Sequence, residues 1–211
     1  HKEYRRQRQM CIRDRGGPKG ALLPHQSLLG HIPGVELPHE FLSYSSPVKD
    51  LFWTPADWAW IGGLFDVLLP AWHFGIPVVS YRSHKFDPEF TFYLLSKFNI
   101  KNTFLPPTAL KMMKAFKSKN TNIKLNLRTV GSGGESLGED LLEWGKNVLG
   151  VGINEFYGQT ECNLTISNSG ILMPRKLGSI GKPVPGQEVK IMSKNGEFIN
   201  EPGVDGEIVI R

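Results

Sequence analysis

A hydroxyl and a carboxylate stand side by side at Thr160 and Glu161, within residues 153–163, which begin as an apolar, strand-like run and read Ile-Asn-Glu-Phe-Tyr-Gly-Gln-Thr-Glu-Cys-Asn. A threonine hydroxyl can hydrogen-bond a phosphate, and a carboxylate oxygen is a ligand that Mg²⁺ prefers. The apolar run predicts a strand that breaks at Gly158, so that both polar side chains follow a strand end. The pair therefore indicates chemistry on a phosphate and its metal ion.

A second loop of the same kind lies earlier in the chain, where residues 130–136 read Val-Gly-Ser-Gly-Gly-Glu-Ser. Between the two loops, residues 139–149 carry apolar side chains close to helical spacing. The order strand, glycine loop, helix, strand, glycine loop predicts a right-handed βαβ unit. Such a unit places both loops at the carboxyl edge of a parallel sheet, where open α/β sheets bind ligands. We expect a nucleotide-sized pocket there.

The rest of the chain also alternates predicted strands with predicted helices. Strands are expected at residues 76–81 and 102–105, and helices at 88–98 and 109–116, the first of them capped by Asp87. This alternation predicts an α/β fold with a parallel sheet. After about residue 176, turn signals separate short strands at 187–192, 197–200 and 207–211. They predict the start of a small all-β subdomain.

Three motifs, taken together, resemble the AMP-forming acyl-CoA synthetases of the adenylate-forming superfamily, in particular the medium-chain enzymes. In the order and approximate spacing of that family, they are Gly17-Pro18-Lys19-Gly20-Ala21, Gly133-Gly134-Glu135-Ser136 and Tyr157-Gly158-Gln159-Thr160-Glu161. The resemblance runs from about residue 16 to the last residue. It implies a partial adenylate-forming N-terminal domain over residues 16–175 and part of a β-barrel subdomain over residues 176–211.

The resemblance also implies a reaction and its cofactors. The family uses ATP and Mg²⁺ to activate a carboxylic acid as a mixed anhydride with AMP, releasing pyrophosphate, and then transfers the acyl group to coenzyme A. Thr160 would hydrogen-bond the α-phosphate, Glu161 would hold magnesium, and Lys19 would end the loop that follows the β- and γ-phosphates. Tyr157 would stack on adenine. The implied nucleotide-binding set is Gly133, Gly134, Glu135, Ser136, Tyr157, Gly158, Gln159 and Thr160.

An acyl pocket is implied at Trp60, Pro107, Thr108 and Gly158. Acetyl-specific relatives have a tryptophan at the place of Gly158, which closes the pocket behind a two-carbon acid. Glycine there implies a longer acid, which we expect to be a medium-chain fatty acid. Core packing is an equal alternative for Trp60, since residues 51–72 are rich in aromatic side chains.

Simpler interpretations exist for the other residues. Thr160 and Glu161 could be a helix N-cap and a first-turn acid, Tyr157 a core aromatic and Lys19 a solvated lysine. A P-loop NTPase is excluded, because Gly20 rather than serine or threonine follows Lys19.

Composition limits the remaining classes. The 211 residues include two cysteines, Cys11 and Cys162, which support neither a disulfide framework nor a four-ligand zinc site. We find no transmembrane run and no signal peptide, so we expect a cytoplasmic protein. The net charge is +5, but residues 1–15 hold six basic and two acidic side chains. The charge therefore belongs mainly to a short arm, and we expect no nucleic-acid partner.

The ends of the chain depart from the family pattern. A Thr/Ser/Gly-rich stretch precedes Gly17 in the family, whereas residues 9–15 here resemble translated adapter sequence, so we expect residues 1–15 to be non-native. We also expect the ribose-binding aspartate and the lysine-bearing C-terminal domain to be absent, which predicts an inactive 211-residue chain from an active parent. The alternatives are an adenylating enzyme with a carrier-protein or other acceptor, and a non-catalytic nucleotide-binding module.

Overall fold

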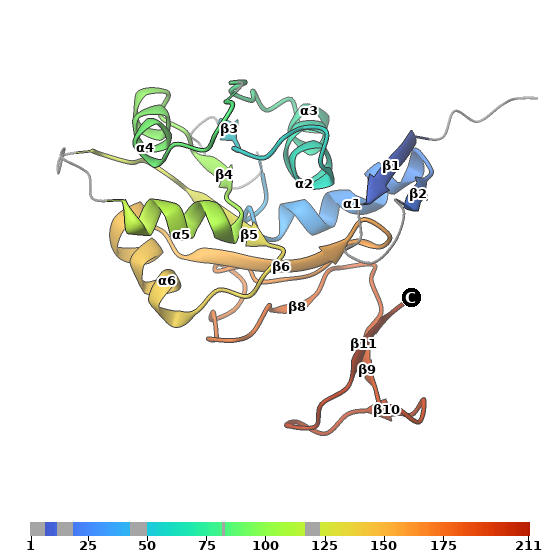
Figure 1. The fold of residues 1–211 in the computed structure, drawn as a ribbon. Coiled ribbons are helices and arrows are strands. Elements are labelled where there is room, and N and C mark those ends of the chain that lie inside the picture. The colour runs from blue at the N-terminus through green and yellow to red at the C-terminus, as the bar shows by residue number, and fades with distance from the viewer. Residues whose placement is uncertain (1–6, 12–18, 43–49, 82, 117–122) are drawn as a thin grey trace, which may run out of the picture.

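A computed structural model describes residues 7–11, 19–42, 50–81, 83–116 and 123–211. Its centre is a six-stranded sheet with the order β3-β4-β5-β6-β7-β8 (Figure 1). The first four strands in this order are parallel, and β7 and β8 continue the sheet antiparallel. The strands are β3 (Phe52–Trp53), β4 (Asn102–Phe104), β5 (Thr129–Gly133), β6 (Ile153–Gln159), β7 (Asn163–Ser167) and β8 (Lys182–Pro183).

Helices cover both faces of the parallel strands. One face packs against α1 (Gln26–Glu36), α2 (Ile61–Gly63), η1 (Leu64–Leu68) and α3 (Leu69–His73). The other packs against α4 (Pro88–Lys97), α5 (Pro107–Ala115), α6 (Glu139–Trp144) and η2 (Gly145–Leu149). Each face buries its own apolar cluster, so the strands contribute apolar side chains in both directions, as in buried parallel sheets. The sheet is mixed and mainly parallel, which confirms the predicted α/β class.

Two smaller antiparallel sheets flank this body. The strands β9 (Val189–Met192), β10 (Phe198–Ile199) and β11 (Glu207–Ile210) form a sheet with the order β10-β9-β11, which Figure 1 shows below the α/β body. They correspond to the three strands predicted after residue 176. A second sheet pairs β1 (Gln7–Cys11) with β2 (Lys19–Leu23).

Local sequence signals set the start of α4 but not every element. Asp87 Oδ1 accepts hydrogen bonds from the backbone nitrogens of Glu89 (2.9 Å) and Phe90 (3.3 Å), so the predicted N-cap is confirmed. The expected strand at residues 76–81 is wrong, because the segment makes only one parallel bridge, between Phe52 and Val78. The expected helix over residues 139–149 forms, but its second half, η2, is a π-helix.

The prediction that the strand breaks at Gly158 is also wrong. β6 continues to Gln159, with a register shift between Tyr157 and Gly158, and then turns back into β7. The antiparallel partner β7 supplies hydrogen bonds for the backbone beyond Gly158, so the strand does not have to end there.

A buried polar network ties together the amino ends of the parallel strands, opposite the glycine loops. Arg128 Nε and Nη2 donate to the two oxygens of Asp50 at 3.0 and 3.2 Å. His39 is 1% exposed, and its Nδ1 lies 3.0 Å from Thr129 Oγ1. Burial, and then the positive charge of Arg128, lower the pKa of His39 to about 3 from its ordinary 6.5.

This low pKa predicts a loss of stability in acid. Below pH 6.5 the unfolded chain binds a proton at His39 that the folded chain does not bind until about pH 3. The free energy of unfolding should therefore fall with decreasing pH through this window, by up to about 1.4 kcal/mol per pH unit from this group. Urea unfolding between pH 7 and pH 4 measures the slope. His39→Gln, which keeps a hydrogen-bonding side chain, should flatten it, and an unchanged slope would contradict this assignment.

Candidate functional site

The loops that follow the four parallel strands meet at one edge of the sheet, because parallel strands share their carboxyl edge. A cavity of about 160 Å³ lies there, between these loops and the helices α1 and η1. It is lined by His31, Trp60, Ile61, Gly62, Asp66, Phe104, Gly133, Gly134, Phe156, Gly158, Gln159, Thr160, Asn163 and Leu164. The cavity thus brings together parts of both predicted glycine loops and the predicted acyl pocket.

Thr160 and Glu161 lie in the turn that joins β6 to β7. Thr160 is half-buried and lines the cavity, whereas Glu161 is exposed and lies outside the cavity lining. The alternative that the two residues cap a helix is wrong, since a strand follows this turn. The turn presents a hydroxyl to the cavity and a carboxylate to solvent nearby.

At two positions of the site, Gly133 and Gly158, neighbouring atoms lie so close that they leave no room for a side chain. A Cβ at Gly158 would lie 2.1 Å from the carbonyl oxygen of Asn163, which is backbone and cannot move aside. A Cβ at Gly133 would lie 2.5 Å from the ring of Phe156. The β6–β7 hairpin and the packing of β5 on β6 therefore demand glycine at these positions, whatever the size of the acyl group. Gly134 has a φ of 105°, which side-chain-bearing residues rarely adopt.

Three residues of the predicted adenine site, Tyr157, Glu135 and Ser136, are outside the cavity lining, whereas Gly133 and Gly134 are part of it. Tyr157 is half-buried, and its hydroxyl oxygen accepts a hydrogen bond from Gln159 Nε2 at 3.1 Å. Glu135 and Ser136 are exposed, and Glu135 forms a 3.0 Å ion pair with Lys111. The alternation of strand residues predicts that Tyr157 shares a face of β6 with Glu155.

Glu155 connects β6 to the second glycine loop. Its Oε1 accepts a hydrogen bond from the backbone nitrogen of Leu137 at 2.9 Å, directly after Ser136. Burial raises the pKa of the Glu155 carboxyl. This bond holds the end of the Gly133–Ser136 loop against the strand that carries Tyr157.

Two of the four predicted acyl-pocket residues line the cavity. Trp60 and Gly158 do, whereas Pro107 is buried at the start of α5 and Thr108 is exposed beside it. The Trp60 ring is 5.8 Å from that of Phe104, which is 5.4 Å from that of Phe156. These three rings make an aromatic wall. The Trp60 side chain is 44% exposed, so the alternative that it is a packed core residue is wrong.

Sequence reasoning missed a buried polar pair in the same cavity. His31 of α1 and Asp66 of η1 are 1% and 7% exposed, and His31 Nε2 lies 2.9 Å from Asp66 Oδ1. Burial raises the pKa of the Asp66 carboxyl, although its hydrogen bond with His31 lowers it. The sequence feature that could have indicated this pair is Asp66 itself, an acidic residue inside the otherwise apolar segment 61–71.

Lys19 is the first residue of β2, and its side chain, like Gly17 and Pro18, lies outside the described part of the chain. Within the described residues, no group of three or more histidine, cysteine or acidic side chains could hold a metal ion. The single carboxylate of Glu161 still suits Mg²⁺, which keeps several waters and commonly binds one or two carboxylates together with substrate phosphates.

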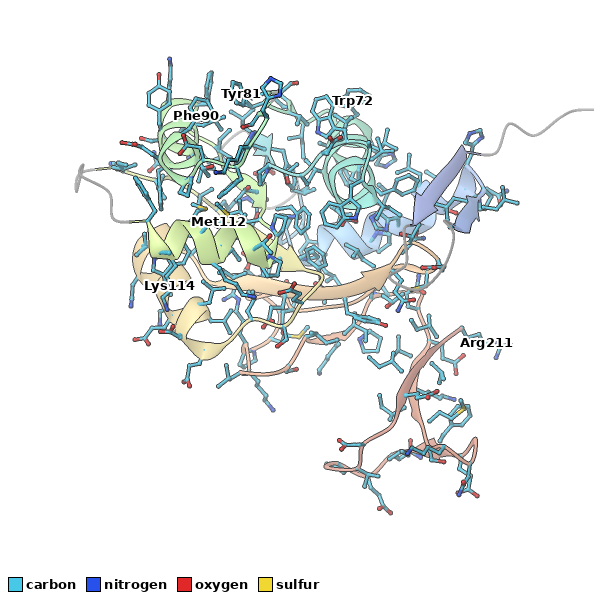
Figure 2. The ribbon with its side chains drawn as sticks, in the orientation of Figure 1. Trp72, Tyr81, Phe90, Met112, Lys114 and Arg211 are labelled. Carbon is cyan, nitrogen blue, oxygen red and sulfur yellow. The ribbon has the colours of Figure 1, made fainter. Side chains whose placement is uncertain are left out.

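A second cavity, of about 480 Å³, lies between the loop after β3 and residues 79–91. Tyr81 and Phe90 lie together along it, with ring centres 4.5 Å apart (Figure 2). Although larger, it is lined by none of the predicted site residues. The 160 Å³ cavity is therefore the candidate site.

A parallel sheet with two glycine loops and a mixed polar and apolar cavity at its carboxyl edge defines a domain of the adenylate-forming type. The chain matches the AMP-binding enzyme family over residues 15–211, and it belongs to that family. None of the helices in the described residues is long and apolar enough to cross a bilayer.

Named relatives agree with this membership. The chain is 33% identical over 165 residues to the mitochondrial acyl-coenzyme A synthetase ACSM3 of Rattus norvegicus, covering 77% of this chain and 28% of that protein. It is 32% identical over 164 residues to the mitochondrial ACSM2B of Homo sapiens, with 77% and 28% covered. The structure of an acyl-CoA synthetase from Brucella canis superposes with a TM-score of 0.84 at 26% identity, covering 95% of this chain and 36% of that one. The chain thus spans about 28% of the length of these curated relatives.

The close contact at Gly158 yields a test of the site's backbone. Gly158→Ala should lower the free energy of unfolding by about 1–3 kcal/mol, because the new Cβ overlaps the Asn163 carbonyl. Gly30→Ala is the matched control, since Gly30 lies within α1 with nothing within 4 Å of its added Cβ, and alanine there should stabilise by about 0.5–1 kcal/mol. Denaturant unfolding measures both changes. Equal stability of the two variants would contradict the described β6–β7 hairpin.

Proposed function

We propose that this chain forms the nucleotide- and acid-binding part of an AMP-forming acyl-CoA synthetase. Such an enzyme converts a carboxylic acid and ATP into an acyl-adenylate and pyrophosphate, and then transfers the acyl group to coenzyme A. One observation carries the proposal: Thr160 and the glycines Gly133 and Gly134 share a cavity with the aromatic wall that begins at Trp60. A polar end beside an apolar end suits a molecule that is part nucleotide and part acyl chain.

The residues at the polar end would each have a simple task. The Thr160 hydroxyl would donate to an oxygen of the α-phosphate, where charge develops as the carboxylate attacks. The Gly133–Gly134 backbone, bare of side chains, would let the nucleotide approach β5 closely, with Tyr157 against adenine. Lys19 would follow the β- and γ-phosphates. Bound Mg²⁺, held through Glu161, would neutralise the charge of the departing pyrophosphate.

The aromatic end of the cavity supports an acyl group longer than acetate, because its three rings offer apolar surface along which a hydrocarbon chain can lie. Trp60, Phe104 and Phe156 would pack against the chain, and Gly158 would leave its path open.

The activity has a direct test in the protein encoded by the complete gene. AMP release from ATP, measured with straight-chain acids of two to twelve carbons, should require coenzyme A for steady turnover and peak beyond acetate. Thr160→Val should lower kcat about a hundredfold, because it removes one donor to the transition state. Glu161→Gln should raise the Mg²⁺ concentration needed for half-maximal rate.

The matched control is Glu143→Gln, because Glu143 is an exposed acid on α6, outside the cavity lining. Glu143→Gln should change neither kcat nor the Mg²⁺ concentration needed for half-maximal rate. Adenylate formation that coenzyme A does not relieve would point to a carrier-protein or other acceptor. Absence of turnover with every acid would favour a non-catalytic nucleotide-binding module.

We also propose a cytoplasmic location, although the named relatives ACSM3 and ACSM2B are mitochondrial proteins. Imaging of the complete protein, tagged at its C-terminus to leave any leader intact, should show diffuse cytoplasmic signal. Colocalisation with a mitochondrial marker would overturn this proposal.

A further inference from the structure

The buried pair His31–Asp66 has a defined orientation. The backbone nitrogen of Leu164 donates to His31 Nδ1 at 3.4 Å, so this ring nitrogen must offer a lone pair. The ring hydrogen is then on Nε2, which donates to Asp66 Oδ1 at 2.9 Å. An edge contact with Phe65, at 5.8 Å between ring centres, also holds the imidazole. His31 therefore positions Asp66 and uses one of its two oxygens.

The second oxygen of Asp66 has no hydrogen-bond donor among the residues that the structure describes. Asp66 is nevertheless 7% exposed and lines the cavity. Among the described residues, only Thr103 and Ser169 have a fully buried side-chain oxygen without a hydrogen-bond partner, so the second oxygen of Asp66 opens to the cavity, where water can reach it. A ligand that displaces this water without replacing its hydrogen bond leaves the carboxyl unsatisfied, at a cost in free energy. The free oxygen is thus available to a group inside the cavity.

Asp50 is a second buried carboxylate, whose hydrogen bonds can be compared with those of Asp66. Both of its oxygens receive hydrogen bonds from Arg128, at 3.0 and 3.2 Å. Asp66, with similar burial, has only one oxygen engaged by the protein. The difference separates a residue that holds the fold from one that has a position left for a ligand.

We propose that Asp66, positioned by His31, is a specificity-determining residue that binds a hydroxyl group on the acyl chain of the substrate. The preferred substrates are then hydroxylated carboxylic acids rather than plain hydrocarbon acids. A hydroxyl can both donate and accept a hydrogen bond, so it matches the carboxyl in either protonation state. This inference rests on the proposed function and adds a substrate class to it.

The expected selectivity follows from what each acid does to the free oxygen. A plain hydrocarbon chain displaces water from Asp66 and replaces it with nothing, whereas a hydroxyl replaces the lost hydrogen bond. The energy of one unsatisfied buried group corresponds to a preference of roughly tenfold to hundredfold in kcat/KM. The aromatic wall of Trp60, Phe104 and Phe156 would bind the hydrocarbon part of both acids alike.

The experiment uses the protein from the complete gene. Values of kcat/KM are compared for hexanoate and for hydroxyhexanoates with the hydroxyl at carbon four, five or six. The unsubstituted enzyme should prefer one hydroxyhexanoate over hexanoate by at least about tenfold. In the double variant His31→Leu/Asp66→Leu, which removes both polar partners together, the preference should vanish and kcat/KM for hexanoate should rise.

Two further variants keep the test decisive. Asp66→Asn retains the shape and the bond to His31, so it should fold and should still reduce the preference severalfold. Asp50→Asn is the matched control, since it disturbs a buried carboxylate far from the cavity lining and should lower the melting temperature without changing the preference.

The possible failures are distinguishable. Turnover of hexanoate and the hydroxyhexanoates at equal kcat/KM, or a preference that survives both Asp66 variants, would overturn the hydroxyl site and leave the proposed function standing. Absence of turnover with every acid by the unsubstituted enzyme would overturn the proposed function, and the hydroxyl site with it.

Discussion

The arrangement of the site depends on one constraint, which is that β6 pairs in parallel with β5 on one side and antiparallel with β7 on the other. The parallel pairing places both glycine loops at one edge of the sheet. The antiparallel pairing turns the chain back directly after Thr160, which keeps this hydroxyl at the cavity instead of passing it into a helix. Both pairings require close backbone approach, and Gly133 and Gly158 are the positions where a side chain would prevent it.

Two kinds of chemistry meet in the resulting cavity. Its sheet side supplies a hydroxyl and bare backbone, which suit phosphate and ribose groups. The aromatic wall is made by Trp60 of the loop after β3 together with Phe104 of β4 and Phe156 of β6, and the helices α1 and η1 add the His31–Asp66 pair beside it. An acid that enters from this side can lie with its carboxylate toward Thr160, while its chain crosses the aromatic rings. Tyr157 is outside the cavity lining, on the opposite face of β6 from Phe156, and under the proposed function it would contact the nucleotide rather than the acyl chain.

Local signals in the sequence were sufficient for much of this fold. The Asp87 cap and the turn residues after residue 176 predicted α4 and the small β-sheet, because both act on neighbouring residues. The alternation of strand and helix segments predicted the parallel sheet, because crossover connections make successive strands parallel. The continuation of β6 past Gly158 was not predictable in this way, since it depends on pairing with β7. The segment 76–81 has the composition of a strand, yet it meets β3 at the edge of the sheet through one bridge only.

In the candidate site, too, residues that depend on local sequence were predicted, and residues that depend on tertiary packing were not. Motif residues that follow strands, such as Gly134 and Thr160, were predicted because their order along the chain encodes the shared edge. The pair His31–Asp66 was missed because 35 positions separate two residues that only the packing of α1 against η1 brings together. Whether Pro107 and Thr108 contribute to acyl binding also depends on tertiary packing, which places both outside the cavity lining.

The central claim is that the α-phosphate and the acyl chain of a single bound acyl-adenylate meet in this cavity, with the adenine beside it against Tyr157. A crystal structure of the complete protein with a non-hydrolysable acyl-adenylate analogue tests it most directly. The account predicts that the phosphate substitute lies within hydrogen-bonding distance of Thr160 Oγ1, the adenine against Tyr157 and the acyl chain along Trp60. An analogue bound elsewhere, for example between the loop after β3 and residues 79–91, or one whose acyl chain leaves the cavity away from Trp60, would contradict it.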